Sequence, residues 1–320
     1  MSYEISKITV LMPVYNGEKY LREAIDSILS QTFTDFEFII VNDISTDSTK
    51  EIISSYNDPR IRLINTDHNM GLVRSLNYGL KLAKGKYIAR MDADDISLPN
   101  RLELQATYLD NYPEVALLGT GKYIINQNGK ILSKTIALSD PCKNILKSNT
   151  FTHGSVMFKK NISEELGYYN ELFKYSEDYE LWLRFAKYYK VSNLPQPLYK
   201  WRVHTENITN TKVEEVMLYT FLAQKLTKNE LDMVVLGKIK NKGIFELYSH
   251  LNTKEKTIFH VAVGHKYVKS NNLHQARDEY KKVFRMDPFN MKNNLHILMS
   301  FFGCNYINKL HELYDFRLRT

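Results

Sequence analysis

Cysteine is scarce in this sequence of 320 residues, where only Cys142 and Cys304 occur, far apart and outside any metal-ligand spacing. Neither a disulfide framework nor a zinc site is therefore expected. No stretch approaches the roughly 18 apolar residues of a membrane span, and the first residues lack the basic start and apolar run of a secretory signal. These absences favour a cytoplasmic protein that is neither secreted nor embedded in a membrane.

Motifs that mark three common enzyme classes are also missing. The sequence contains no G-x-x-x-x-G-K-[ST] phosphate loop and no G-x-G-x-x-G after its first apolar segment. An NTPase and a typical dinucleotide-binding enzyme are therefore disfavoured. The absence of a G-x-S-x-G motif weighs against a serine hydrolase.

Positive charge is unevenly spread along the chain, whose formal net charge is +7. Residues 1–224 carry 26 Lys and Arg against 27 Asp and Glu, whereas residues 225–320 carry 17 against 9. A region this basic can contact nucleic acid, an anionic membrane or an acidic acceptor, or it can be an ordinary lysine-rich helical surface. The charge distribution divides the chain into a nearly neutral part and a basic part.

Short apolar segments alternate with helical patterns over the first two thirds of the chain. Residues 7–15, 36–43, 60–66 and 86–92 are apolar, rich in β-branched residues and bounded by polar turns, as buried strands are. Residues 17–31 and 71–85 repeat apolar residues at the spacing of one helix face, and the second segment closes on a glycine. The series predicts an α/β fold with a mostly parallel sheet flanked by helices.

Polar side chains follow three of these expected strands. Tyr15 and Asn16 come after the first, Asp43 after the second, and Asp92 and Asp94 after the fourth. The carboxyl ends of parallel strands meet at one edge of a sheet, where ligands of such folds bind. This edge is therefore the candidate site.

The sequence "MDADD" concentrates negative charge at the end of an apolar strand. Asp92 and Asp94 can approach one hard divalent cation and the oxygens of a diphosphate, while Asp95 steadies the loop. Mg²⁺ or Mn²⁺ is the natural ion for such ligands. Carboxylates this close repel one another, so a cation must compensate them, and Arg90 is near in sequence.

Two later segments add candidates. Glu177 and Asp178 stand immediately before a helical pattern with an apolar stripe, and His204 follows an expected strand beside Arg202. A histidine near a divalent ion and phosphates can act as a ligand.

Each candidate also has a structural interpretation. Asp43 can cap the next helix, although Ser45, Thr46 and Asp47 are also available for capping. The D-x-D sequence can be a solvated turn, and the acidic pair at 177–178 can be a partner of the helix dipole. A lone histidine is more often structural than catalytic.

The ordered motifs resemble those of a family-2 glycosyltransferase of the GT-A fold. The resemblance covers about residues 5–210 and rests on the segments "VLMPVYNGEKYL", "IIVNDISTDST", "NMGLVRSLNYGL", "GKYIARMDADDISLPNRLE", "SEDYELWLRF" and "YKWRVHTENIT". Within the family the chain is most similar to bacterial enzymes that build lipopolysaccharide, lipooligosaccharide and capsule chains. These are inverting enzymes that use nucleotide-sugar donors, commonly UDP-sugars.

The resemblance implies a role for each matching position. Pro13, Tyr15 and Glu18 would line the base and ribose pocket. Asp43 would bind uracil, and Asp92 would contact ribose or sugar. Asp94 and His204 would hold Mn²⁺ or Mg²⁺ on the diphosphate, with Arg74 and Arg90 near phosphate or sugar. Asp178 of the Glu177–Asp178 pair would be the general base that activates the acceptor hydroxyl.

The resemblance thus predicts metal-dependent, inverting transfer of one sugar, such as GlcNAc, Gal, GalNAc or Glc, from a UDP-sugar to a free or lipid-linked glycan. The family's processive synthases carry transmembrane helices and a Q-x-x-R-W motif, which are absent here. One departure is Ile44, where the family often has glycine; if the position needs a positive φ, isoleucine is costly. A nucleotidyltransferase and a non-catalytic sugar-binding or nucleotide-binding protein of the same fold remain alternatives.

The basic region, residues 225–320, has a mostly helical pattern and no transferase motif. Gly264, Tyr267, Ala276, Tyr280 and Pro288 are spaced as in one tetratricopeptide repeat. A simple helical hairpin is the favoured interpretation, because such repeats usually stack in threes to bury a core. The charge and the apolar segment 295–302 predict peripheral attachment to anionic lipids at the inner face of the membrane, without a nucleic-acid partner. The expected domains are therefore residues 1–224, catalytic, and residues 225–320, helical.

Overall fold

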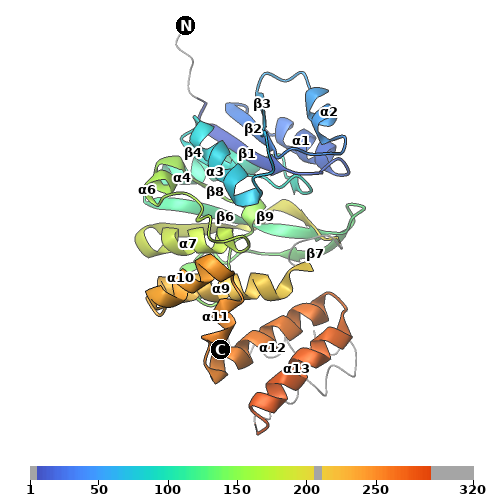
Figure 1. Cartoon of the computed structure of the whole chain (residues 1–320). Helices are drawn as coiled ribbons and strands as arrows, with labels where there is room; N and C mark the ends of the chain where they lie inside the picture. Colours follow the sequence, from blue (N-terminus) through green and yellow to red (C-terminus); the bar gives the residue numbers. More distant parts are fainter. Residues whose placement is uncertain (1–5, 205–210, 290–320) are drawn as a thin grey trace. The chain divides into compact units, whose positions relative to one another are not determined.

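The computed structural model describes residues 6–204 and 211–289 (Figure 1). The chain divides into two compact units, residues 1–204 and 205–320. This division falls before the change in charge at residue 224, so the boundary of the catalytic domain stays a prediction. Among the helices in the described ranges, none is long and apolar enough to cross a membrane.

The first half of unit 1 is the expected strand-helix series. Its four strands lie side by side and parallel in the order β3 (Ile61–Asn65), β2 (Phe36–Asn42), β1 (Ile8–Val14) and β4 (Tyr87–Arg90). The strands β1, β2 and β4 are buried along their whole length except for one half-buried residue, which explains their near-continuous apolar sequences. The register pairs Leu11 with Arg90 and Val14 with Asn42, so the residues after these strands reach one edge together.

Three helices connect these strands, namely α1 (Leu21–Leu29), α2 (Thr49–Ser54) and α3 (Leu72–Leu82). The apolar stripe predicted for α1 is confirmed, since Leu21, Ala24, Ile25 and Ile28 are buried. Helix α3 packs closely on the sheet at Gly79, where an added Cβ would lie 2.3 Å from a methyl group of Leu11.

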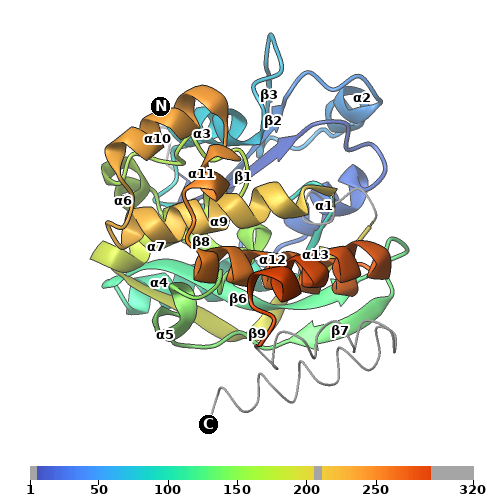
Figure 2. The ribbon, with the colours of Figure 1, turned by 60° about the horizontal axis from the view of Figure 1, so that its bottom comes forward.

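The second half of unit 1 interrupts the parallel pattern. It contains β5 (Ile96–Ser97), α4 (Arg101–Asn111), β6 (Val115–Ile125), β7 (Ile131–Thr135), α5 (Cys142–Ile145), the 3₁₀ turn η1 (His153–Ser155), β8 (Met157–Lys159), α6 (Lys160–Glu165), α7 (Glu177–Tyr188) and β9 (Lys190–Arg202). The sheet order is β3-β2-β1-β4-β8-β6-β9-β5, with β7 on β6. Strand β8 pairs antiparallel with both β4 and β6, whereas the long strands β6 and β9 pair in parallel (Figure 2).

One apolar core unites the two halves of this unit. It includes Val10 and Met12 of β1, Leu102 of α4, Met157 of β8 and Tyr199 of β9. The predicted α/β class and the helical region after it are both confirmed.

Unit 2 is helical over its described residues. It comprises α9 (Val213–Thr227), α10 (Met233–Lys242), α11 (Glu246–Ser249), α12 (Thr253–Lys269) and α13 (Leu273–Met286). Helices α12 and α13 run side by side. Gly264 faces the ring of Tyr280 so closely that a Cβ at this position would clash with the ring. The sequence spacing therefore reflects a close helix crossing, while the likeness to one tetratricopeptide repeat stays a prediction. The apolar segment 295–302 lies outside the described residues.

Candidate active site

The loops after β1 and β2 are tied to each other at the predicted edge. The Asn16 side chain accepts a hydrogen bond from the backbone N–H of Thr46 at 2.8 Å, and the Glu18 carboxylate accepts one from Ser48 at 2.9 Å. Glu18 therefore helps to hold the loop after β2 in place. Pro13 is buried within β1, whereas Tyr15, just beyond the strand, is 53% exposed and available to a ligand.

Asp43 lies at the end of β2 and is buried. Its carboxylate accepts hydrogen bonds from the backbone N–H groups of Met70 and Gly71, both at 2.8 Å, and from the Thr66 hydroxyl at 3.1 Å. These donors belong to the loop before α3, so Asp43 joins two strand-end loops. The backbone N–H of Thr49 in the following helix is instead bound by Asp47, at 3.0 Å.

Ile44 has a φ of 54°, so this position does require the left-handed backbone region. The turn is closed by the Asn42 side chain, which accepts a hydrogen bond from the N–H of Ser45 at 3.2 Å. A glycine adopts this conformation without strain, whereas a β-branched residue is strained there. The turn is thus kept although isoleucine stands at the position where the family often has glycine.

Arg90 and Asp92 form an ion pair at the end of β4. Their side chains approach to 2.6 Å, with the guanidinium 1% exposed and the carboxylate 31% exposed. Burial raises the pKa of Asp92, while Arg90 opposes this rise. Arg90 therefore supplies the positive charge that was expected to compensate the acidic loop, and the Asp92 carboxylate stays partly exposed.

Asp94 and His204 are brought together from positions 110 residues apart. The histidine Nε2 lies 2.9 Å from a carboxylate oxygen of Asp94, and both side chains remain partly exposed. Cis ligands of an octahedral ion with bonds of about 2.1 Å lie about 3 Å apart, so this spacing fits one shared cation. In the described residues no group of three or more His, Cys, Asp or Glu side chains could hold an ion.

These two donors fit a site that is completed by substrate. Mg²⁺ and Mn²⁺ are commonly held by one or two carboxylates, with the remaining positions taken by phosphate oxygens and water. An imidazole nitrogen is a softer donor than a carboxylate, which favours manganese over magnesium.

Arg202 fastens the end of β9 to the acidic loop. Its Nε donates to the carbonyl oxygen of Asp94 and its backbone N–H to the carboxylate of Asp95, both at 2.7 Å. The buried guanidinium also pairs with Glu23 at 2.6 Å and lies 4.4 Å from the ring centre of Tyr20. Asp95 is itself buried, and burial together with Asp94 and Asp92 raises its pKa well above the usual range. The expectation that Asp95 steadies the loop therefore agrees with its contacts.

The acidic pair stands at the N-terminus of α7. Glu177 is 6% exposed, and burial together with Asp178 raises its pKa to about 8. Asp178 is half-buried; it accepts hydrogen bonds from the Tyr179 N–H at 2.7 Å and from the Asn149 side chain at 2.8 Å. Burial raises the pKa of Asp178, and these two donors oppose that rise. Burial thus raises the pKa of both carboxyl groups, and the two hydrogen-bond donors favour the ionised form of Asp178.

The turn η1 lies between the acidic loop and the acidic pair. At Gly154 an added Cβ would lie 2.6 Å from a carboxylate oxygen of Asp92, so only glycine fits. The neighbouring His153 places Nδ1 3.6 Å from Glu177 and Nε2 2.8 Å from the hydroxyl of Tyr169. Burial, followed by Arg90, lowers the pKa of His153 well below its usual range, so the imidazole is neutral.

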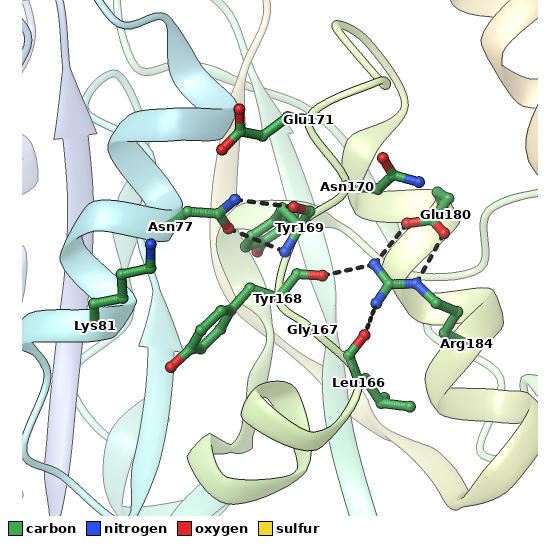
Figure 3. Close-up of a pocket in the computed structure, with 10 residues that line it drawn as sticks. All are labelled: Asn77, Lys81, Leu166, Gly167, Tyr168, Tyr169, Asn170, Glu171, Glu180 and Arg184. Atoms are coloured by element: carbon green, nitrogen blue, oxygen red, sulfur yellow. Dashed lines mark hydrogen bonds and ion pairs between the residues drawn. The ribbon is translucent and has the colours of Figure 1, made fainter. Parts of the chain in front are cut away.

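Arg74 is separate from this cluster in its contacts. It lies in the first turn of α3, is 61% exposed and pairs with Glu171 at 3.0 Å. Glu171 lines a hollow between α3, the loop 166–171 and α7 (Figure 3). There Asn77 makes two hydrogen bonds to the backbone of Tyr169, and Arg184 is engaged by Glu180 and by backbone carbonyls. None of the residues that line the hollow is a predicted site residue, and two of them, Glu171 and Tyr169, contact Arg74 and His153.

Sequence reasoning assigned no role to Arg202, His153 or Asn149. Arg202 was noted only as a neighbour of His204, and a lone histidine or asparagine in a polar loop carries no pattern that distinguishes it. Their importance becomes apparent only from contacts with residues far away in the sequence.

Comparison with known proteins identifies the family. The sequence model of Glycosyl transferase family 2 matches residues 9–167. An uncharacterized glycosyltransferase of Haemophilus influenzae is 30% identical over 321 residues, which cover 92% of this chain and 96% of that protein. The O-antigen biosynthesis glycosyltransferase WbnJ of Escherichia coli is 36% identical over 216 residues, which cover 63% of this chain and 82% of that protein.

Solved structures agree on the fold. The structure of S. aureus TarS residues 1–349 in complex with UDP-GlcNAc superposes with a TM-score of 0.59 at 18% identity, covering 96% of this chain and 92% of that one. At this identity the similarity establishes the GT-A fold alone. Together with the sequence matches, it shows that the chain is a glycosyltransferase and belongs to family 2.

Proposed function

We propose that this glycosyltransferase moves one sugar, such as GlcNAc, Gal, GalNAc or Glc, from a UDP-sugar to a glycan hydroxyl with inversion and with Mn²⁺ or Mg²⁺. The observation that carries the proposal is the placement of two unlike groups around η1. Asp92 abuts Gly154 on one side, and Glu177 faces His153 on the other. This placement supports a diphosphate site and a proton-accepting site that both adjoin η1.

Asp178 is the proposed general base. It takes the proton of the acceptor hydroxyl while that oxygen bonds to the anomeric carbon, and the bond from this carbon to the UDP oxygen breaks. Glu177 keeps its proton because its pKa is raised to about 8, so it does not compete for this role at neutral pH. Asp92 is proposed to contact ribose or sugar, and Arg90 to lie near phosphate or sugar while it neutralises part of the acidic loop.

Asp94 and His204 are the residues proposed to hold the divalent ion. When bound, the ion would neutralise charge on the diphosphate, which increases as the leaving group departs.

At the nucleoside end of the donor, we assign Pro13, Tyr15 and Glu18 to the base and ribose pocket and Asp43 to uracil. Asp43 already accepts three hydrogen bonds of the roughly four that a carboxylate can take, so it can accept one more. Arg74 is proposed to reach phosphate or sugar after releasing Glu171.

The choice of donor and acceptor class rests on relatives. TarS has been solved with UDP-GlcNAc, which supports a UDP-sugar donor here. WbnJ is named for O-antigen biosynthesis, which supports an acceptor among bacterial-type surface polysaccharides or their lipid-linked precursors.

Calorimetric titration of UDP in the presence of Mn²⁺ tests the donor site without any acceptor. We expect binding that weakens at least tenfold with chelator and also in Asp94→Ala, because the diphosphate then loses its bridging charge. The matched control is Asp140→Ala, an exposed carboxylate outside the site. Equal binding by wild type and Asp94→Ala would contradict the metal assignment, and absence of binding to UDP, GDP and dTDP would favour a non-catalytic protein.

Inversion is tested by following slow donor hydrolysis by proton NMR. A UDP-α-sugar should first release the β-sugar, before mutarotation mixes the anomers, and Asp178→Asn should lower the rate at least a hundredfold. Initial release of the α-sugar would contradict the inverting assignment.

We also propose a cytoplasmic protein with peripheral contact to anionic lipids through the basic region. In support, α10 carries Lys238, Lys240 and Lys242 and no acidic residue, while Met233 and Val234 at its start are 75% and 66% exposed. Exposed apolar side chains beside lysines are typical of interfacial helices.

Co-sedimentation with vesicles containing phosphatidylglycerol tests this contact. Reversal of the three α10 lysines to Glu should weaken binding at least tenfold, since each basic residue near an anionic surface contributes about 1 kcal/mol. Reversal of Lys130, Lys134 and Lys143 in unit 1 is the charge-matched control. If both triple variants bind equally well, α10 is not the contact.

A further inference from the structure

The loop between α5 and β8 is fastened to α7 at three places. The hydroxyl of Tyr179 donates to the carbonyl oxygen of Ile145 at 2.6 Å, and the ring of Phe151 lies 6.2 Å from that of Trp182. Between these anchors, the Asn149 side chain donates to Asp178 at 2.8 Å. All three contacts end on one helix, so the loop and the N-terminus of α7 are held as a single unit.

The orientation of the Asn149 amide is determined by its second contact. Its Oδ1 accepts a hydrogen bond from the backbone N–H of Phe151 at 3.1 Å. Because that partner can only donate, the oxygen must face Phe151 and the NH₂ group must face Asp178. The assignment of donor and acceptor is therefore set by the chain.

We propose that Asn149 is a positioning residue for the general base, which aims the Asp178 carboxylate and keeps it ionised. This inference rests on the proposed function of Asp178. With Oδ2 bound by Asn149 and Oδ1 by the Tyr179 N–H, the carboxylate cannot rotate freely. Asn149 belongs to an exposed loop, so one hydrogen bond links this loop to the proposed base.

Other charged groups also act on Asp178 and must be considered. Glu177 adjoins it on α7, while Asp92 and Arg90 influence it from the end of β4. His153 on η1 is neutral, and Tyr169 faces the same cluster. These groups are unchanged in a substitution at Asn149, so a change in the titration of Asp178 reports on the hydrogen bond itself.

The test compares Asn149→Ala and Asn149→Asp with wild type in UDP-sugar hydrolysis from pH 5 to 9. We expect kcat to fall about tenfold at pH 6.5 in Asn149→Ala, because a misaligned base is inefficient. The acid limb of the profile should move to higher pH, and further in Asn149→Asp, where a second carboxylate opposes ionisation. UDP affinity should stay within about twofold of wild type, since no donor-site residue contacts Asn149. Ser148→Ala in the same exposed loop is the control and should leave the profile unchanged.

A second measurement does not depend on turnover. The carboxyl carbon of Asp178 can be titrated by NMR in protein labelled at aspartate and identified by its loss in Asp178→Asn. A higher pKa of Asp178 in Asn149→Ala supports the inference, and an unchanged pKa with an unchanged rate profile overturns it. If the wild-type protein neither binds UDP nor hydrolyses UDP-sugars, the proposed function itself fails, and the inference fails with it. If the wild-type protein is active but Asn149→Ala changes neither the pKa of Asp178 nor the rate profile, only the inference about Asn149 fails.

Discussion

Ile44 shows how a single residue can carry strain beside a binding site. Its φ of 54° lies in the left-handed region, which costs an L-residue about 1–2 kcal/mol. The side chain is 44% exposed, so its burial offsets little of that cost. The turn is retained because the Asn42 side chain and the strand pairing around it fix the backbone.

Replacement of Ile44 should therefore stabilise the protein. Ile44→Asn should raise the free energy of unfolding by about 1 kcal/mol, and Ile44→Gly by somewhat less, because glycine loses about 0.5–1 kcal/mol more in chain entropy. Ile44→Val, which keeps the β-branch, is the control and should give no gain. Urea unfolding measures all three, and a gain in Ile44→Val equal to that in Ile44→Asn would show that strain is not the cause.

At the scale of elements, glycines determine how closely helices pack. In α12, a Cβ at Gly264 would lie 2.5 Å from a ring carbon of Tyr280 in α13. In α10, a Cβ at Gly237 would meet no heavy atom within 4 Å. The same substitution should therefore have opposite effects in two helices of one unit.

Gly264→Ala should destabilise the α12–α13 pair by about 1–3 kcal/mol, because a packed ring must move. Gly237→Ala should stabilise α10 by about 0.5–1 kcal/mol through helix propensity alone. Hydrogen exchange of the backbone amides in residues 253–286 measures the effect of Gly264→Ala. Exchange of the amides in residues 233–242 measures the effect of Gly237→Ala. Similar exchange in the two variants would contradict the close crossing.

At the scale of the whole molecule, the buried acidic pair links stability to pH. Burial and Asp178 raise the pKa of Glu177 from 4.5 to about 8, so the folded state holds a proton that the unfolded chain releases above pH 4.5. The proton held by Glu177 therefore contributes fully to the stability of the folded state below pH 4.5, and this contribution is lost as the pH rises through 8. This loss is a consequence of placing Glu177 beside the base in a water-poor site.

Glu177→Gln should remove that contribution to the pH dependence. Between pH 5.5 and 8.5, the free energy of unfolding of wild type should fall more than that of Glu177→Gln, as measured by urea unfolding with Mn²⁺ absent. Glu171→Gln, a 53% exposed carboxylate, is the control and should follow wild type. Parallel curves for wild type and Glu177→Gln would show that Glu177 ionises normally.

Several features of the molecule follow from sequence alone. The strands β1 to β4 and the helices α1 and α3 were predicted from the spacing of apolar residues, because burial on one face or on both faces imposes a local pattern. Asp43, Asp92 and Asp94 were placed at one edge by the rule for parallel strands, and the ordered motifs identified the family before any contact was known. Local residue patterns were sufficient for each of these conclusions.

Only the tertiary structure decided what holds those residues in place. The antiparallel strand β8 between β4 and β6 carries η1 into the site, and no local pattern encodes that order. Arg202 reaches Glu23 across 179 residues, and Asn149 reaches Asp178 across 29. A sequence period reports which side of an element is buried, whereas such pairs depend on how distant elements approach. The sequence thus determined the strands and the residue types at their ends, and the packing of β8, β9 and α7 decided which side chains orient the proposed metal ligands and the proposed base.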